Sequence, residues 1–486
     1  MMFTVFLIYL ALVFFIGLAA ERFISKSEEG YYLGDRNFGP LATAISAGAS
    51  DTSGWIFIGA VGYAYVAGIS TMWMLPGFVA GYLLNWFVVA PRFRRSGEEL
   101  GALSLPDYFG KRFRDPKNLL KISAGIIIAF FFIAYMASQL TAAGKALSAI
   151  VSYDYTWGLI LSAAFVTGYS IFGGYRAAVW TEVSQGLIML GVLILFPLYM
   201  ILFPLGGFGE FFNTLQSIDP ILLSANGGTG GAIGFGVILG LIGFGLGEPG
   251  QPHIIQRFLS AKDDQTIRQG SVIAMIWVIV VMTGSNLLGL IGRIMVPDID
   301  DPEYVFPQLT MDIMHPAIAG IIVGAIFAAI QSTFSSQLMV ATQTIASDLL
   351  KSLSKKTFTP KQMVTISRVT MILLGILSTG LALLNVQAVF NLVLYAWAGL
   401  AASFGPLLII SLYTKWVTRQ GAFWGMITGA VVTITWINSP LVTYVYEIIP
   451  AMLASTTVIY LVSKATAKKE APFLNSEEEQ KTTNTI

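Results

Sequence analysis

The chain has 486 residues, of which 55% are hydrophobic and only 11% are charged, and its mean hydropathy is +0.72. Soluble domains carry about 25% charged residues, so this composition indicates an integral membrane protein. The net charge of +1 and the lack of a long basic run argue against a nucleic-acid partner, and the absence of cysteine excludes disulfides, thiol catalysis and thiolate metal sites.

Apolar runs long enough to cross the lipid bilayer recur along most of the chain. A spanning helix needs about 20 apolar residues, and this length predicts an all-α protein with about thirteen transmembrane helices. The first run lacks a basic leader and a cleavage site, so we expect a retained helix rather than a signal peptide. The predicted spans lie near residues 3–21, 41–69, 71–91, 120–149, 156–174, 180–203, 231–256, 270–292, 314–350, 363–384, 387–413, 421–438 and 441–462.

The charges of the loops predict the orientation. Loops on alternate sides of the predicted bundle differ sharply in Lys and Arg, and Arg293 is the one basic residue close to the poorer side. Because basic loops stay in the cytoplasm, we expect the N-terminus outside a cell (plasma or inner) membrane and the C-terminus inside. Residues 1–463 then form one transmembrane domain, and the polar residues 464–486 form a cytoplasmic tail that we expect to be disordered.

The second span contains a polar stretch, residues 46–55, in which Asp51 is surrounded by hydroxyls and glycines. A carboxylate is costly in hydrocarbon unless it faces a partner or a watery cavity. Small residues also allow a helix to unwind, so that free carbonyls line a polar cavity suited to a small cation. The alternative is a close helix–helix contact in which Asp51 bonds to a neighbour.

The seventh span is interrupted as well, by four glycines and prolines within residues 247–252 and further glycines at Gly243 and Gly245. Gly and Pro cost a helix roughly 1 and 3 kcal/mol relative to Ala, so we predict a second break. The two interruptions lie five spans apart, which gives the halves near 41–203 and 231–413 opposite orientations. Paired broken spans in an inverted repeat indicate the central site of a transporter.

Three further groups could contribute to such a site. Ser332 and Thr333 in the ninth span are adjacent hydroxyls that could join the backbone oxygens of the second span around sodium, or simply bond back to their own helix. Glu248 could contact a substrate amine or cation, act as a proton-linked switch, or pair with a neighbouring hydroxyl or amide. Residues 173–182 predict a compact inner turn in which Glu182 pairs with Arg176. We find no nucleophile with a base, phosphate loop or carboxylate dyad, so an enzyme is not expected.

Several motifs together resemble the sodium:solute symporter family, and most of all its proline-transporting members. They extend from the second to the eleventh predicted span and are highly specific to the family. They are residues 49–55, 105–109, 173–182, 245–247 with 250–253, the pair Ser332 and Thr333, and residues 395–399.

The resemblance implies a LeuT-type inverted repeat of five helices, spans 2–6 and 7–11, in a protein of thirteen helices. It also implies a sodium site between the second and ninth spans and a substrate site against the seventh. The implied sodium ligands are the carbonyls of Ala49, Thr52 and Ala329 and the hydroxyls of Ser332 and Thr333. The residues implied in ion coupling are Asp51 and Glu182, and those implied in substrate binding are Ser53, Gly54, Tyr135, Phe244, Glu248 and Pro252.

The seventh span departs from the pattern of the proline-transporting members. Those members have tryptophan where this chain has Phe244 and tyrosine where it has Glu248. The carboxylate could hold the second positive group of a basic amino acid or amine, or the ammonium of proline itself.

We therefore expect a sodium-coupled importer of proline or a related small amino acid that works by alternating access. The alternatives are an importer of a cationic amino acid or amine recognised by Glu248, and an ion channel or ion-translocating subunit. The expected partners are a small solute, sodium and the lipid bilayer.

Overall fold

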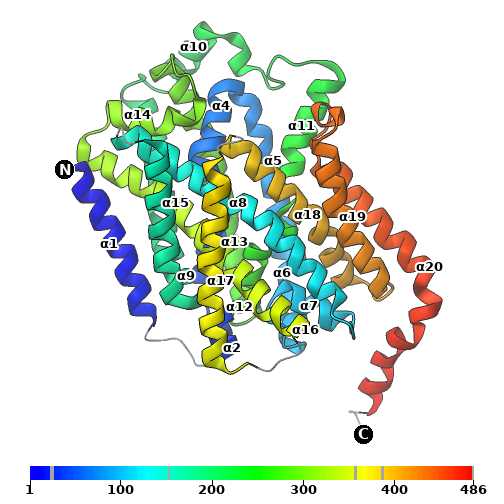
Figure 1. The fold of residues 1–486 in the computed structure, drawn as a ribbon. Coiled ribbons are helices and arrows are strands. Elements are labelled where there is room, and N and C mark those ends of the chain that lie inside the picture. The colour runs from blue at the N-terminus through cyan, green and yellow to red at the C-terminus, as the bar shows by residue number, and fades with distance from the viewer. Residues whose placement is uncertain (22–26, 152–153, 355–357, 385–387, 484–486) are drawn as a thin grey trace.

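The computed structural model describes residues 1–21, 27–151, 154–354, 358–384 and 388–483, which form a bundle of helices (Figure 1). Ten helical stretches of the described chain are long and apolar enough to cross a membrane. The α-helices are α1 Met2–Glu21, α2 Glu28–Leu33, α3 Pro40–Asp51, α4 Val61–Ala67, α5 Met74–Leu83, α6 Ala90–Glu99, α7 Leu105–Arg112, α8 Leu119–Val151, α9 Tyr155–Leu202, α10 Phe208–Ile218, α11 Gly231–Gly245, α12 Pro252–Ser260, α13 Asp264–Met295, α14 Val305–Ile313, α15 Pro316–Gln343, α16 Leu350–Ser354, α17 Pro360–Leu383, α18 Val389–Tyr413, α19 Arg419–Ile437 and α20 Ile448–Thr483.

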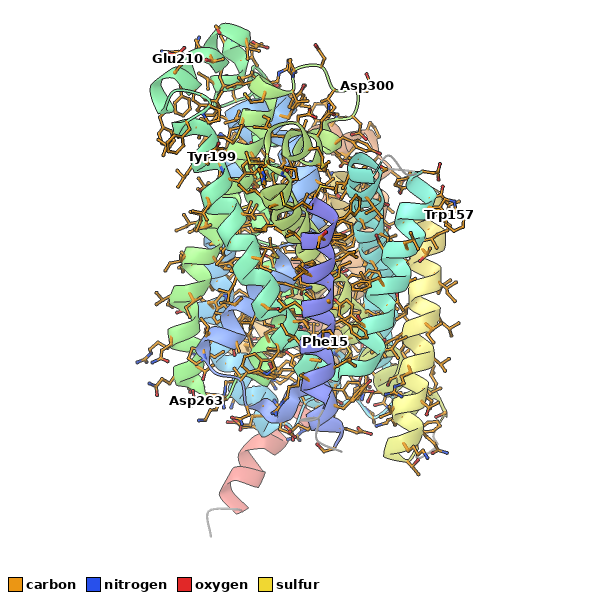
Figure 2. All side chains as sticks on the ribbon, turned by 90° about the vertical axis from the view of Figure 1, so that its left-hand side faces the viewer. Phe15, Trp157, Tyr199, Glu210, Asp263 and Asp300 are labelled. Carbon is orange, nitrogen blue, oxygen red and sulfur yellow. The ribbon has the colours of Figure 1, made fainter. Side chains whose placement is uncertain are left out.

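Charged side chains lie toward the two ends of the bundle, and apolar ones cover its middle. Figure 2 shows Glu210 and Asp300 at one end, Asp263 at the other, and Phe15 on the belt between them. Leu7, Ile8, Leu12 and Phe15 of α1 all point outward and are exposed in the isolated chain. Exposed apolar side chains over the height of a bundle are those that contact lipid tails. The two termini lie toward opposite ends (Figure 1).

The centre of the bundle is formed by α15, which packs against α1, α3, α8 and α9. Every residue of α15 from Ile322 to Gln343 is buried, including its hydroxyl and amide side chains. Buried polar groups need partners in a low-dielectric interior, so α15 is also where hydrogen bonds between distant helices concentrate.

The two predicted interruptions are present. The second span consists of α3, which ends at Asp51, and a helical continuation that begins with a π-helical turn at Trp55. The seventh span consists of α11, which ends at Gly245, and α12, which begins at Pro252. Gly245 lies where α11 crosses α5, and a Cβ atom on it would lie only 2.1 Å from the backbone carbonyl carbon of Gly77. Glycine is therefore required there for close packing and not only to break the helix.

Two expectations about element ends were wrong, and a third is confirmed only in part. The compact inner turn expected within residues 173–182 is confined to its start, because α9 joins two helices across a kink at Gly174, whose φ is 56°, and the second helix already includes residues 175–182. The last spanning helix begins at Ile448 rather than near 441, because Pro440 starts a short 3₁₀ turn. The chain then packs on α11, where the lack of a side chain at Gly236 leaves room for the Tyr444 carbonyl. The tail after Lys464 is helical to Thr483 as a continuation of α20, although we expected it to lack structure.

Helix α7 is attached to the bundle by charged side chains outside the spanning segments. The Ser104 hydroxyl caps its first turn by accepting from the Asp107 N–H at 3.0 Å. The Asp107 carboxylate contacts Lys121 Nζ at 2.9 Å and Lys111 Nζ at 2.8 Å. Burial alone would raise the pKa of Asp107, but the two ammonium groups more than offset it, so its pKa lies below the ordinary value.

Candidate functional site

The break between α3 and the turn at Trp55 faces α15, where the two predicted hydroxyls lie. Ser332 Oγ donates to the Ala49 carbonyl at 2.7 Å and to the Ala329 carbonyl at 3.1 Å. Thr333 Oγ1 donates to the Ser50 carbonyl at 2.8 Å. The hydroxyls therefore bond across to the broken helix, and not only to their own helix backbone. Such a set of neutral, hard oxygens is the chemistry that a small monovalent cation requires.

Ser50 and Thr52, at the end of α3, make contacts that the sequence did not predict. Ser50 was not among the expected ligands, yet its carbonyl is the one that Thr333 reaches. Thr52 is buried, and its hydroxyl accepts from Nε1 of Trp277 on α13 at 2.9 Å. Because that contact engages the Thr52 hydroxyl, the carbonyl of Thr52 is its candidate oxygen for the set.

A second polar group lies on the other face of the break and contains both deep carboxylates. Asp51 Oδ2 accepts from the Tyr82 hydroxyl of α5 at 2.7 Å. The carboxyl group of Glu248 is a near neighbour of the Asp51 carboxyl, and the two groups act on each other electrostatically. Glu248 is 1% exposed, and its Oε1 has no hydrogen-bond partner in the described structure. Two buried carboxyl groups this close require a shared proton or a neighbouring cation.

The remaining expected substrate residues surround the same break. Ser53 Oγ accepts from the N–H of Trp55 at 3.1 Å, and Tyr135 of α8 lies beside Ser53, with its own side chain 1% exposed. A Cβ atom on Gly54 would lie 2.7 Å from Ile330, so the backbone there is in direct contact with α15. Pro252 is buried at the first turn of α12.

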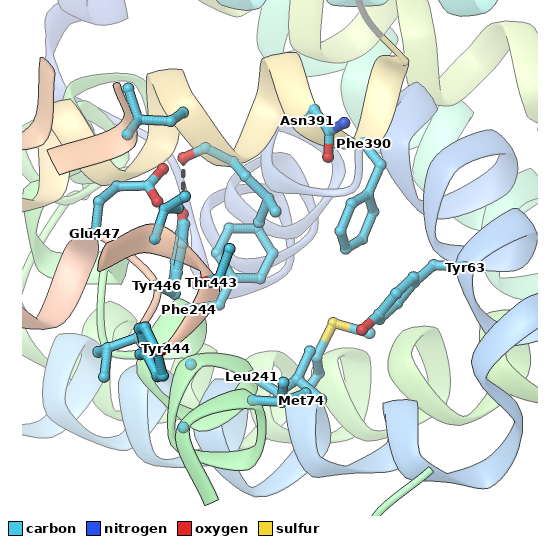
Figure 3. A pocket seen from close by; sticks show the side chains of 17 residues that line it. Tyr63, Met74, Leu241, Phe244, Phe390, Asn391, Thr443, Tyr444, Tyr446 and Glu447 are labelled. Atoms are coloured by element: carbon cyan, nitrogen blue, oxygen red, sulfur yellow. Dashed lines mark hydrogen bonds between the residues drawn. The ribbon is translucent and has the colours of Figure 1, made fainter. Parts of the chain in front are cut away.

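Phe244 lies on the α11 side of the break, beside Trp55. It is the last large side chain of α11 and packs edge-on against Trp55, with 5.0 Å between ring centroids. It also lines a cavity that opens beyond the site and whose wall includes Phe390 of α18 (Figure 3). Phe244 therefore separates the buried residues around the break from that cavity.

Two residues that we did not predict form hydrogen bonds with backbone groups at the two helix breaks. The side-chain oxygen of Gln139 on α8 accepts from the N–H of Gly54 at 2.8 Å, a donor that the break leaves without a helical partner. Trp397 Nε1 on α18 donates to the Phe244 carbonyl at 2.9 Å, and the Trp397 carbonyl accepts from Gln251 Nε2 at 3.1 Å. Gln139 is an isolated amide in an apolar span, and that anomaly was the available sequence signal.

Glu182 contacts a different arginine from the one expected. Its carboxylate pairs with Arg257 of α12 at 2.6 Å, whereas Arg176 donates to the Gly34 carbonyl at 3.2 Å. The hydroxyls of Ser46 and Ser336 also donate to Glu182. One buried cluster thus connects α9, α12, α3 and α15. Glu182 and Arg176 are six residues apart on the same helix and make contacts in different places, Glu182 with Arg257 in the bundle interior and Arg176 with Gly34 after α2.

The chain matches the model of the sodium:solute symporter family over residues 31–429. It is 39% identical over 478 residues to the sodium/proline symporter of Staphylococcus aureus, covering 94% of this chain and 92% of that protein. It is 38% identical over 438 residues to the high-affinity proline transporter PutP of Bacillus subtilis, covering 89% and 92%.

Two solved structures show the same fold. One is a substrate-bound, outward-open sodium-coupled sialic acid symporter, with a TM-score of 0.79, 20% identity, and coverage of 96% of this chain and 98% of that one. The other is MhsT in complex with L-phenylalanine, with a TM-score of 0.55, 14% identity, and coverage of 88% and 98%. At these identities the likeness concerns the fold of the helical bundle.

Proposed function

The chain belongs to the sodium:solute symporter family, and we propose that it imports proline or a closely related small amino acid together with sodium. Family membership makes it a transporter rather than an enzyme or a simple channel. The observation that carries the proposal further is the pair of α15 hydroxyls that face the backbone of a broken helix, because this arrangement offers a cation several neutral oxygens inside the bundle.

For sodium we propose the carbonyls of Ala49, Thr52 and Ala329 and the hydroxyls of Ser332 and Thr333. The short distances from Ser332 to the Ala49 and Ala329 carbonyls support this set. Sodium would replace these hydrogen bonds, since the hydroxyl hydrogens can rotate away and present lone pairs. Sodium is here a transported solute.

For the organic solute we propose the opposite face of the break, formed by Ser53, Gly54, Tyr135, Phe244, Glu248 and Pro252. Their burial supports a site closed to water on both sides. Asp51 then lies between the solute and the sodium ligands, within reach of Glu248, and would couple the two. Glu182 would act at a distance, by holding α12 to α3 and α15 through Arg257.

We also propose a finer architecture of thirteen spans with inverted repeats near 41–203 and 231–413, within one domain over 1–463, followed by the tail 464–486. The similar position of the two breaks in α3 and α11 supports the repeat. Termini at opposite ends of the bundle are consistent with an odd number of spans, and the loop charges favour an external N-terminus in the cell membrane (Figure 1).

The sodium gradient is large enough for the proposed import. One charge moving inward through about 100 mV releases roughly 2.3 kcal/mol. A tenfold sodium gradient adds about 1.4 kcal/mol, so one sodium per cycle supports accumulation of several hundredfold. A cationic solute would gain further from the voltage.

A second candidate substrate class follows from Glu248. Its buried Oε1 has no hydrogen-bond partner in the described structure, and its carboxyl group neighbours that of Asp51, so the site has two carboxyl groups where a zwitterion brings one ammonium. A basic amino acid or small diamine would supply the additional positive group.

Uptake into proteoliposomes tests the proposal and separates the two substrate classes. We expect an inward sodium gradient, but not an equal potassium gradient, to drive radiolabelled L-proline uptake, and Thr333→Val to raise the sodium concentration for half-maximal uptake at least several-fold. Uptake of lysine or ornithine instead, abolished by Glu248→Gln, would identify the second class. Equal uptake in sodium and potassium, or unchanged sodium activation in Thr333→Val, would refute the assigned sodium site.

A further inference from the structure

Three helices carry a patch of exposed basic and aromatic side chains at one end of the bundle. These helices are α6, α18 and α20; each belongs to a stretch long and apolar enough to span the membrane, and α18 packs against the other two. Arg94 of α6 contacts Asp264 at 3.2 Å, so this is the end of the bundle at which Figure 2 shows Asp263. We call this surface the basic patch, and its members are Arg92, Tyr413, Lys415, Trp416, Tyr460 and Lys464.

The arginine of the basic patch lies over an aromatic ring. The guanidinium carbon of Arg92 is 3.7 Å from the centre of the Tyr413 ring, and Nη1 of Arg92 donates to the Leu412 carbonyl at 3.4 Å. Tyr413 is itself fixed, because its hydroxyl donates to the Val88 carbonyl at 2.9 Å. Both groups that hold Arg92 are neutral, so they orient the guanidinium without balancing its charge. A guanidinium oriented in this way is suited to bind a phosphate group through two N–H donors.

The other side of the basic patch is a pair of rings next to a lysine. Trp416 and Tyr460 are both exposed and pack edge-on, with 5.8 Å between ring centroids. Nζ of Lys464 lies 5.9 Å from the centre of the Tyr460 ring, and Lys415 directly precedes Trp416. Trp and Tyr rings at the ends of spanning helices typically lie at the level of the lipid headgroups. The basic patch therefore presents its positive charges at that level.

The protein does not balance the charge of the basic patch. Arg95, three residues after Arg92, contacts the Asp264 carboxylate at 2.5 Å. By contrast, none of the carboxylates among the described side chains pairs with Arg92, Lys415 or Lys464. Near a membrane surface, each basic side chain favours an anionic lipid by about fivefold. Three unbalanced cations beside one another therefore favour a negatively charged partner.

Apolar side chains continue the surface from the basic patch toward the middle of the bundle. Leu83 and Phe87 precede Arg92 in the helical stretch that leads into α6, and Leu453 precedes Tyr460 in α20. All three apolar side chains are exposed in the isolated chain. A free phosphate ion would leave this apolar surface uncovered, whereas the acyl chains of a phospholipid cover it. The partner that fits both parts of the surface is a lipid.

We propose that the basic patch binds the headgroup of an anionic phospholipid. Its phosphate is bound by the Arg92 guanidinium, its negative charge is also attracted by Lys415 and Lys464, and its acyl chains lie along the exposed apolar side chains. The lipid then contacts three helices that are distant in sequence, at the place where each leaves the bilayer. Its position in the cytoplasmic leaflet follows from the orientation proposed above, whereas the binding itself depends on neither import nor sodium.

Native mass spectrometry of the purified full-length protein in a neutral detergent tests the basic patch, because it counts bound lipids directly. The probes are phosphatidylglycerol and phosphatidylcholine with the same acyl chains, titrated without sodium and without proline. We expect phosphatidylglycerol to bind about fivefold or more tightly than phosphatidylcholine, and Arg92→Gln, Lys415→Gln and Lys464→Gln each to weaken its binding by about fivefold. Arg268→Gln removes an exposed arginine of α13 at the same end of the bundle, and this matched control should bind phosphatidylglycerol as the wild type does.

A soluble headgroup distinguishes a lipid site from a site for free anions. Glycerophosphoglycerol carries the same phosphodiester without acyl chains, and we expect it not to displace phosphatidylglycerol at equal concentration. Displacement would overturn the proposal, because the basic patch would then be a site for a soluble phosphate ester. Equal wild-type affinity for the two lipids would also overturn it, as would a preference for phosphatidylglycerol that persists without the three charges, or a loss in Arg268→Gln as large as in Arg92→Gln.

Lipid binding and import can fail separately. Sodium-driven proline uptake by a protein that binds the two lipids equally would support import and overturn the lipid site. Uptake that is equal in sodium and potassium, in a protein whose preference for phosphatidylglycerol requires Arg92, would support the lipid site and refute the import mechanism.

Discussion

The Glu182–Arg257 pair gives the sharpest quantitative prediction. Both side chains are almost fully buried, at 0% and 1% exposure, and their closest atoms are 2.6 Å apart. Glu182→Gln removes the negative charge and leaves Arg257 without a counter-charge in the bundle interior. Breaking a buried pair from one side costs about 3–5 kcal/mol, mostly as the desolvation of the remaining ion.

The two serines of the cluster do not remove that cost. Ser46 and Ser336 donate to Glu182, and both can still bond to a glutamine side chain. Arg257 keeps its contact to the His253 carbonyl at 2.8 Å, a neutral acceptor that cannot balance the charge. We therefore expect the loss in Glu182→Gln to lie within the range of about 3–5 kcal/mol rather than below it.

A double-mutant cycle measures this energy. The free energy of unfolding is obtained from SDS-driven unfolding of Glu182→Gln, Arg257→Met and the double variant. We expect the double variant to be more stable than the sum of the single losses predicts, because neither charge is then left alone. Arg176→Gln is the control, and we expect its loss to be small and additive with that of Glu182→Gln. Additivity between positions 182 and 257, or coupling between 182 and 176, would refute the assignment.

Two further predictions concern the buried break and the charged end of the bundle. Gln139→Leu leaves the Gly54 N–H without its acceptor and should cost about 1–3 kcal/mol of unfolding free energy, and Gln139→Met, which also lacks the acceptor but keeps the length of the side chain, should cost a similar amount; unchanged stability in both variants would contradict the contact. Because Lys121 and Lys111 hold the pKa of Asp107 below its ordinary value, this carboxylate stabilises the fold above its unfolded pKa of about 3.8, and that contribution is lost as pH falls through the lower folded value. Asp107→Asn should therefore be less stable than wild type at neutral pH, with the difference closing in acid, as thermal unfolding against pH would measure; a difference that does not change with pH would contradict it.

The sequence determined the class of protein and the places where its helices break. Apolar length decides which segments can cross a bilayer, because each span must satisfy its backbone internally. The density of glycine and proline after Gly243 decides that α11 cannot continue, since those residues disfavour helix wherever they stand. The sequence also indicated the candidate polar groups of the site, namely the hydroxyls of Ser332 and Thr333 and the carboxylate of Asp51. Polar side chains within an apolar span are costly in lipid, and they therefore indicate a buried contact or a binding site.

The tertiary structure decided which of those polar groups meet. Glu182 is six residues from Arg176 and 75 from Arg257, yet it pairs with the distant arginine, because Arg257 of α12 reaches the face of α9 on which Glu182 lies, whereas Arg176 bonds to the Gly34 carbonyl. Sequence spacing favours the local contact, and it carries no information about how two remote helices are rotated against each other.

The same limit explains the residues that sequence analysis missed. Gln139 accepts a hydrogen bond from the Gly54 N–H, and Trp397 donates one to the Phe244 carbonyl at the end of α11. Both contacts form only because helices far apart in the chain cross at those points. Arg92 likewise lies over the Tyr413 ring because α18 packs against α6, although the two residues are far apart in the chain. Helix breaks follow from local chemistry, whereas partners, burial and cavities follow from how the finished helices pack.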